Sequence, residues 1–116
     1  MSEPALPVET GSAHPPRRLL RGCEQLAHLV GRRLLVGITF RDPHGAVIES
    51  SQFCGRVLEV ADGVVVVERG DGEPAVLPAE AAAYEPAKPG RYVLSGSGEA
   101  VINPDFVTVW DVQANS

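Results

Sequence analysis

Three histidines and two cysteines are the side chains of this sequence best suited to hold a metal ion. Cys23 and His28 lie five positions apart in a segment with helical periodicity, and the other three are scattered: His14, His44 and Cys54. Zinc needs three or four convergent protein ligands. We therefore predict no metal site, and we predict that Cys23 and Cys54 are small core residues.

Two turns contain residues that could support acid–base or nucleophilic chemistry. Asp42 and His44 share one turn, and Ser95 and Ser97 share a glycine-rich one. A catalytic serine elbow or a phosphate loop would need a following helix, but Glu99 and a strand-like segment follow instead. We interpret all four as turn residues, because Asp in a turn usually bonds to its own backbone and the Gly96-Ser97-Gly98 segment suits a tight turn. The sequence therefore predicts no catalytic residue, no cofactor and no enzymatic activity.

Basic residues are concentrated near the start of the chain. Six arginines between Arg17 and Arg41 face one acid, Glu24, whereas twelve acidic residues face four basic ones from Asp42 onward, and the net charge is −5. Either the two halves attract each other within one fold, or a basic helix docks on an acidic partner. The candidate partner-binding arginines are Arg17, Arg18, Arg21, Arg32 and Arg33.

Aromatic side chains offer a second candidate surface, because small β domains use such groups to stack bases or hold peptides. Phe40 and Phe53 fit the core. Tyr84, in a proline-bounded segment, and Trp110, near the C-terminus, are predicted to be partly exposed and to contact a partner. The remaining members of the aromatic set are Tyr92 and Phe106.

Length and composition favour one globular domain in a reducing compartment. The chain has 116 residues, of which 44% are hydrophobic and 22% charged. We predict a disordered tail at residues 1–18, one domain at 19–113 and a short tail at 114–116. The acidic, proline-containing start is unlike an export signal, no apolar segment is long enough to cross a membrane, and the cysteines form no ligand pair. We therefore expect a cytoplasmic protein.

The hydrophobic period predicts one helix followed by strands. Leu19, Cys23 and Leu26 recur at helical spacing between Pro15 and Leu29, with Gly22 weakening the middle of the helix. After Gly31 the period changes to two. The expected strands are 36–40, a segment over 46–60 with a bulge or bend near Gly55, a central strand at 64–67, and 75–77, 91–94, 100–102 and 107–112, with a single helical turn or structured loop at 79–87.

Short, closely spaced and strongly bent strands favour a small closed barrel. The helix and the segments LLVGITFRDPHG, QFCGRVLEVADG and VVVVERGDGEPAVLP, over residues 25–90, resemble the Sm-like and SH3-like barrels. The segment PGRYVLSGSGEAVINPDFVTVW resembles part of small bacterial proteins of unassigned function. We therefore expect a mainly β fold: a strongly bent antiparallel barrel of five to six strands with one N-terminal helix.

A protein-binding or adaptor module is the function that these observations favour, acting through its edge strands or its basic helix. The alternative is an Sm-like RNA-binding module that uses the arginine cluster, although the residues from Asp42 onward are net acidic. Homo-oligomers are a further expectation. If the barrel is imperfectly closed, Val64–Val67 and Val107–Val112 would pair between copies.

Overall fold

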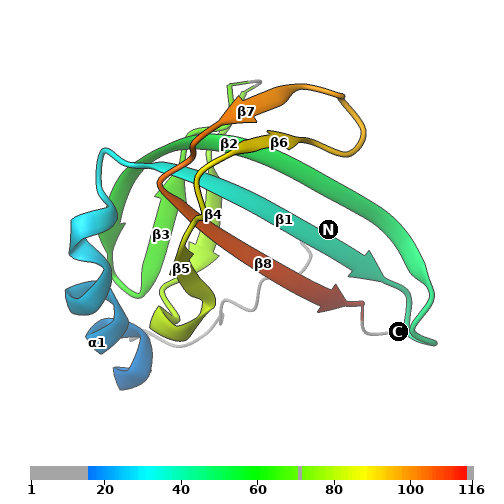
Figure 1. The fold of residues 1–116 in the computed structure, drawn as a ribbon. Helices are drawn as coiled ribbons and strands as arrows, with labels where there is room; N and C mark the ends of the chain where they lie inside the picture. Colours follow the sequence, from blue (N-terminus) through cyan, green and yellow to red (C-terminus); the bar gives the residue numbers. More distant parts are fainter. Residues whose placement is uncertain (1–15, 71, 115–116) are drawn as a thin grey trace.

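A curved six-stranded sheet packs against one N-terminal helix, which lies at one end of the sheet, in the computed structural model, which describes residues 16–70 and 72–114 (Figure 1). The elements are α1 (Arg17–Leu26), the 3-10 turn η1 (Ala27–Leu29), β1 (Arg33–Arg41), β2 (Val47–Ala61), β3 (Val64–Val67), β4 (Ala75–Pro78), the 3-10 turn η2 (Ala81–Ala83), β5 (Tyr84–Pro86), β6 (Arg91–Val93), β7 (Ala100–Ile102) and β8 (Phe106–Gln113). The large sheet has the order β4-β3-β2-β1-β8-β5, and β6 and β7 form a separate hairpin.

The helix predicted between Pro15 and Leu29 is present as α1 and η1, and Gly31, with φ +86°, follows it. Gly22 is buried where the helix meets the chain after β4, and a Cβ atom at this position would overlap the carbonyl oxygen of Ala79. Gly22 therefore allows a close backbone approach, a role that helix propensity alone does not reveal.

Strand β2 is long because it serves two neighbours. Its first part pairs with β1 up to Arg56, and its last part, from Val57, pairs with β3. The register shifts between Val57 and Glu59, which confirms the irregularity predicted near Gly55. Gly55 lies where the strand passes from one neighbour to the other, and a Cβ atom there would overlap the carbonyl oxygen of Glu68.

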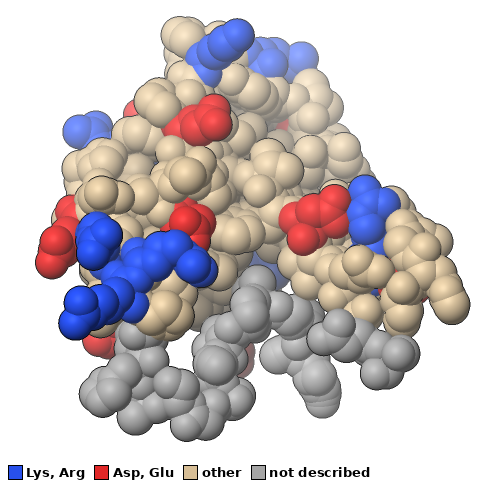
Figure 2. Space-filling model, turned by 90° about the horizontal axis from the view of Figure 1, so that it is seen from below, with Lys and Arg blue, Asp and Glu red and all other residues tan. Residues whose placement is uncertain are grey.

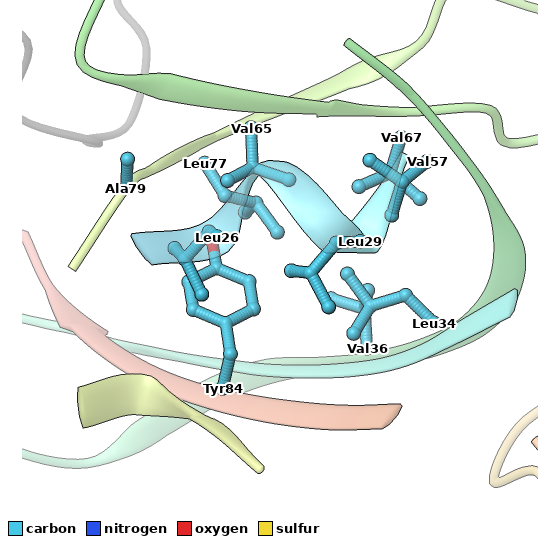
Figure 3. Close-up of a cluster of buried hydrophobic side chains, with 10 residues drawn as sticks. All are labelled: Leu26, Leu29, Leu34, Val36, Val57, Val65, Val67, Leu77, Ala79 and Tyr84. Carbon is cyan, nitrogen blue, oxygen red and sulfur yellow. The ribbon is translucent and has the colours of Figure 1, made fainter. Parts of the chain in front are cut away.

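The main core fills the space between α1 and the inner face of the sheet, as Figure 3 shows for ten buried side chains. Leu34 and Val36 of β1 and Leu29 of η1 are completely buried there. Ile38, Phe106 and Trp110 pack at the margin of this cluster. We call the side of β1 and β8 that carries these residues the inner face.

The opposite, outer face is covered in part by the β6–β7 hairpin. Leu35 of β1 is buried with Leu94 and Val101, and Cys54 and Val107 pack against them. Both faces of β1 are therefore buried at residues 34–36. This explains why these three residues are all apolar and do not alternate with polar ones.

The fold is mainly β with one N-terminal helix, as predicted, but the predicted barrel is wrong because the sheet is not closed. Strands β4 and β5 end the sheet without pairing with each other, and β1 and β8 are parallel. The segment that joins β4 to β5 packs on α1 instead, where Arg18 Nε lies 2.7 Å from Glu80 Oε1. The helix and η2 thus fill the place where closure would occur. The resemblance to Sm-like and SH3-like barrels is therefore not upheld.

The predicted tail lies largely outside the described residues, since the structure describes nothing before residue 16, and Arg17 and Arg18 belong to α1. Within the part of the chain that is described, no helix has the length and apolar character needed to cross a membrane.

Candidate interaction surface

The histidines and cysteines weighed as metal ligands in the sequence do not come together within the described part of the chain. No group of three or more histidine, cysteine, aspartate or glutamate side chains with ligand-like placement occurs among residues 16–70 and 72–114. The Cys23 thiol accepts a hydrogen bond from the Gly63 amide at 3.2 Å, and the His28 ring makes an edge contact with Phe106. His14 lies outside the described residues.

The turn residues considered for catalysis have local hydrogen bonds. Asp42 Oδ1 accepts from the amides of His44 and Ala46 at 2.8 and 2.9 Å. Ser97 Oγ accepts from the Glu99 amide at 3.1 Å. These are the side-chain-to-backbone bonds typical of Asx and Ser turns. The sequence predicted the bond for Asp42, whereas for the Ser97 segment it predicted only a tight turn.

A polar pocket of about 240 Å³ lies between β2 and the β6–β7 hairpin. The residues that line it include Arg33, Cys54, Arg56, Glu68 and Glu99. Both guanidinium groups bind backbone carbonyls, because Arg33 Nη1 lies 2.9 Å from Ile102 O and Arg56 Nη1 lies 2.7 Å from Gly31 O. The pocket therefore combines two structural arginines with two acids, and it lacks an excess of either charge for binding an ion.

Cys54 is a half-buried free thiol in this pocket rather than a fully buried core residue. Burial raises the pKa of the thiol, and the neighbouring Arg33 opposes this effect only in part. The thiolate is the reactive form, so a raised pKa means less thiolate at neutral pH.

We expect alkylation of Cys54 by iodoacetamide to be slower at neutral pH than alkylation of a cysteine in an unstructured peptide. Its rate should rise only at more alkaline pH, and unfolding in urea should remove the difference. Site-resolved mass spectrometry measures this, with Cys23 quantified separately in the same chain. Reaction of Cys54 as fast as the peptide control would contradict a merely structural thiol.

Two of the five candidate arginines form contacts within the fold, and the other three are exposed. Arg18 pairs with Glu80, and the Arg33 side chain holds the carbonyls of Ile102 and Asn103. Arg17 and Arg21 are exposed on α1, and Arg32 is exposed in the bend just before β1. Figure 2 shows basic side chains gathered on the side where Figure 1 places α1, with acidic side chains beside them. The five arginines thus do not act as one group, because Arg18 and Arg33 are engaged in contacts within the fold.

The two aromatic candidates lie together, but on the inner face. Tyr84 and Trp110 have ring centroids 6.1 Å apart in an edge contact. Tyr84 is buried, its hydroxyl donates to Pro78 O at 2.8 Å, and burial raises its pKa. The predicted exposure of Tyr84 is therefore wrong, because β5 places this side chain against the main core. Trp110 is half-buried, and its buried indole N–H has no acceptor among the described residues.

The terminal strands of the sheet are poor sites for pairing with another chain. Strand β4 has four residues, follows Pro74 and ends at Pro78. Strand β5 has three residues and ends at Pro86. Short length and proline are common protections of an exposed sheet edge, because proline lacks the amide hydrogen that a new strand would bond.

Strand β8 is different, because β5 covers only its first part. The pairing runs from Pro86 opposite Phe106 to Tyr84 opposite Thr108, whereas β8 continues to Gln113 (Figure 1). No described residue pairs with Val109–Gln113 on the side away from β1. This stretch, which we call the open edge, contains no proline.

The orientation of the backbone shows which groups the open edge offers. The Ala114 amide donates to Arg41 O at 2.8 Å, so it faces β1. Backbone groups of successive strand residues point to opposite sides of the strand. The amides and carbonyls of Trp110 and Val112 therefore also face β1, and those of Val109, Asp111 and Gln113 face outward.

The side chains of the open edge are accessible on the outer face. Val109 is 70% exposed, and Asp111 forms an ion pair with Arg41, with Oδ1 2.8 Å from Nε. Sequence reasoning named Trp110 as a partner-binding residue, and it included Val109 and Asp111 only within the stretch Val107–Val112 that was expected to pair between copies. The sequence predicted a strand at Val107–Val112, but nothing in this stretch shows that the pairing with β5 stops at Thr108.

No protein-family model, curated protein or solved structure matches this chain. The site is therefore interpreted from its own geometry.

Proposed function

We propose that this protein is a non-enzymatic binding module that captures an extended protein segment at the open edge of β8. The observation that carries this proposal is the unpaired, proline-free stretch Val109–Gln113 in a sheet whose terminal strands are both protected. A segment that adds to such an edge gains main-chain hydrogen bonds without needing a particular sequence.

Side chains on the two faces would supply the selectivity. Alternate residues of an added strand point to opposite faces of the sheet. On the inner face they would lie beside Trp110 and Val112, and on the outer face beside Val109 and the Arg41–Asp111 ion pair. The edge therefore favours a segment with an apolar residue for the inner face and polar residues for the outer one.

Replacing Val109 with proline tests this proposal, because it removes an outward amide and adds a ring at the edge without removing a bond to β1. Proline is tolerated where the amide side of an edge faces solvent. We expect captured protein to fall about tenfold or more, and the free energy of unfolding to change by less than about 1 kcal/mol. Val109→Thr, which keeps the amide, is the matched control and should bind like the wild type.

The measurement is capture from a lysate of the source organism with the wild-type chain, both Val109 variants and a variant with all five candidate arginines changed to alanine. Protein retained at high salt by the wild type and Val109→Thr, but not by Val109→Pro, supports strand addition. Equal capture by Val109→Pro contradicts it. RNA that is lost with salt and with the arginines would favour the RNA-binding alternative instead.

A cytoplasmic location is part of this proposal. Cys23 and Cys54 are free thiols, which suits a reducing compartment.

A further inference from the structure

We propose that the segment which adds to the open edge is β8 of a second copy of this chain, in antiparallel orientation across a two-fold axis. This inference rests on the proposed function and names its partner. Each copy carries the same open edge, so one symmetric contact pairs the outward backbone groups of both copies. The ion pair with Arg41 neutralises Asp111, which allows two edges to approach although the chain has a net charge of −5.

Strand β5 limits the registers in which two such edges can pair. In an antiparallel pair, outward-facing residues lie opposite outward-facing residues. The residue opposite Thr108 of the second copy would occupy the place that Tyr84 of that copy already holds. If Asp111 lies opposite Val109 of the second copy, Val112 lies opposite Thr108 and meets Tyr84 of that copy. Val112 is part of β8 and cannot turn away, so this register is excluded.

Placing Asp111 opposite Asp111 of the second copy fails for two reasons. Ala114, which is held in line with β8 by its bond to Arg41 O, would then meet Tyr84 of the second copy. The two carboxylates would also lie directly opposite each other, which is destabilising.

The longest register that places no described residue opposite Thr108 brings Asp111 opposite Gln113 of the second copy. Val112 then lies on the two-fold axis opposite its own counterpart, and Trp110 lies opposite the small side chain of Ala114. The Asp111 carboxylate, paired with Arg41, faces the Gln113 side chain, whose amide donates to Pro43 O at 3.0 Å, and apolar side chains face apolar ones. No like charges therefore lie opposite each other in this register. Because the backbone groups of Val112 face β1, the two Val112 residues form a non-hydrogen-bonded pair with Cα atoms about 4.5 Å apart.

This geometry can be tested with single cysteines, since a Cα separation of about 4.5 Å lies within the range that a disulfide spans. We expect Val112→Cys to form a covalent dimer with oxidised glutathione, more than tenfold faster than Asp111→Cys or Gln113→Cys. Asp111→Cys would crosslink fastest if Asp111 lay on the two-fold axis, and Gln113→Cys would crosslink fastest if Gln113 did. Non-reducing electrophoresis and peptide mapping identify the disulfide. The wild-type chain, treated in the same way, shows how much covalent dimer forms through Cys23 and Cys54.

Sedimentation equilibrium of the unmodified chain provides an independent measurement. We expect a dimer at tens of micromolar for the wild type and Val109→Thr, and a monomer for Val109→Pro. Any of three results overturns the inference. They are a strictly monomeric wild type, a dimer that Val109→Pro leaves intact, and preferential crosslinking at a control position. If the wild type is monomeric but captures another protein in a Val109→Pro-sensitive manner, the second copy is the wrong partner and the proposed function stands. If neither association nor capture responds to Val109→Pro, the proposed function fails as well.

Discussion

Changing Gly55 to alanine is expected to lower the free energy of unfolding by about 3 kcal/mol or more. The added Cβ atom would overlap the carbonyl oxygen of Glu68 and lie 2.9 Å from its carbonyl carbon. These are backbone atoms at the end of β3, and the Glu68 amide itself donates to Arg56 O at 2.9 Å. Relief therefore requires β2 and β3 to separate where β2 changes neighbours.

Gly37→Ala is the matched control for Gly55→Ala, because it makes the same chemical change in the same sheet. The nearest atoms to a Cβ at Gly37 belong to the flexible Gln52 side chain, at 4.0 Å. We expect Gly37→Ala to be neutral, or to stabilise by up to about 1 kcal/mol through the lower entropy of the unfolded chain. Urea unfolding followed by circular dichroism measures both. Equal stabilities of the two variants would show that β2 and β3 do not approach closely at Gly55.

Changing Gly22 to alanine is expected to destabilise the protein by about 2 kcal/mol, although alanine is the better helix former. The helix preference for alanine contributes about 1 kcal/mol in favour of the variant. Against it, the Cβ atom would overlap the carbonyl oxygen of Ala79 and lie 3.0 Å from its carbonyl carbon, and overpacking of this kind costs about 3 kcal/mol. The steric effect therefore exceeds the propensity effect, and α1 must move away from the segment that leads into η2.

Gln25→Gly calibrates the propensity contribution, since Gln25 is exposed on the same helix. It should cost about 1 kcal/mol. Thermal and urea unfolding of the Gly22 and Gln25 variants, compared with the wild type, separate the two effects. A Gly22→Ala protein that is more stable than the wild type would mean that α1 does not contact Ala79 and does not pack on the segment between β4 and β5.

Local pattern determined most of the elements. The change of period from 3.6 to 2 after Gly31 identified α1 and β1, and the apolar run at Val64–Val67 identified a strand between two others. Prolines predicted a single helical turn or loop over 79–87, where the structure has η2 and also the strand β5, which was not predicted. These features depend on residues that are close in sequence, because helical and strand periodicities and turn residues act over a few positions. The bend near Gly55 was also visible, since the apolar residues of β2 change parity there.

Tertiary contacts alone determined the sheet order and the open edge. Strand β8 lies parallel to β1, although residues 42–105 separate the two strands in the chain. An alternating pattern predicts which face of a strand is buried, but it does not predict which strand lies beside it. For the same reason Val64–Val67, expected to pair between copies, lies between β2 and β4, whereas part of Val107–Val112 has a free side. The burial of Tyr84, the carbonyl contacts of Arg33 and the close approaches at Gly22 and Gly55 all join residues far apart in the chain. Only the packing of the complete fold brings such groups together, so no local signal in the sequence could disclose them.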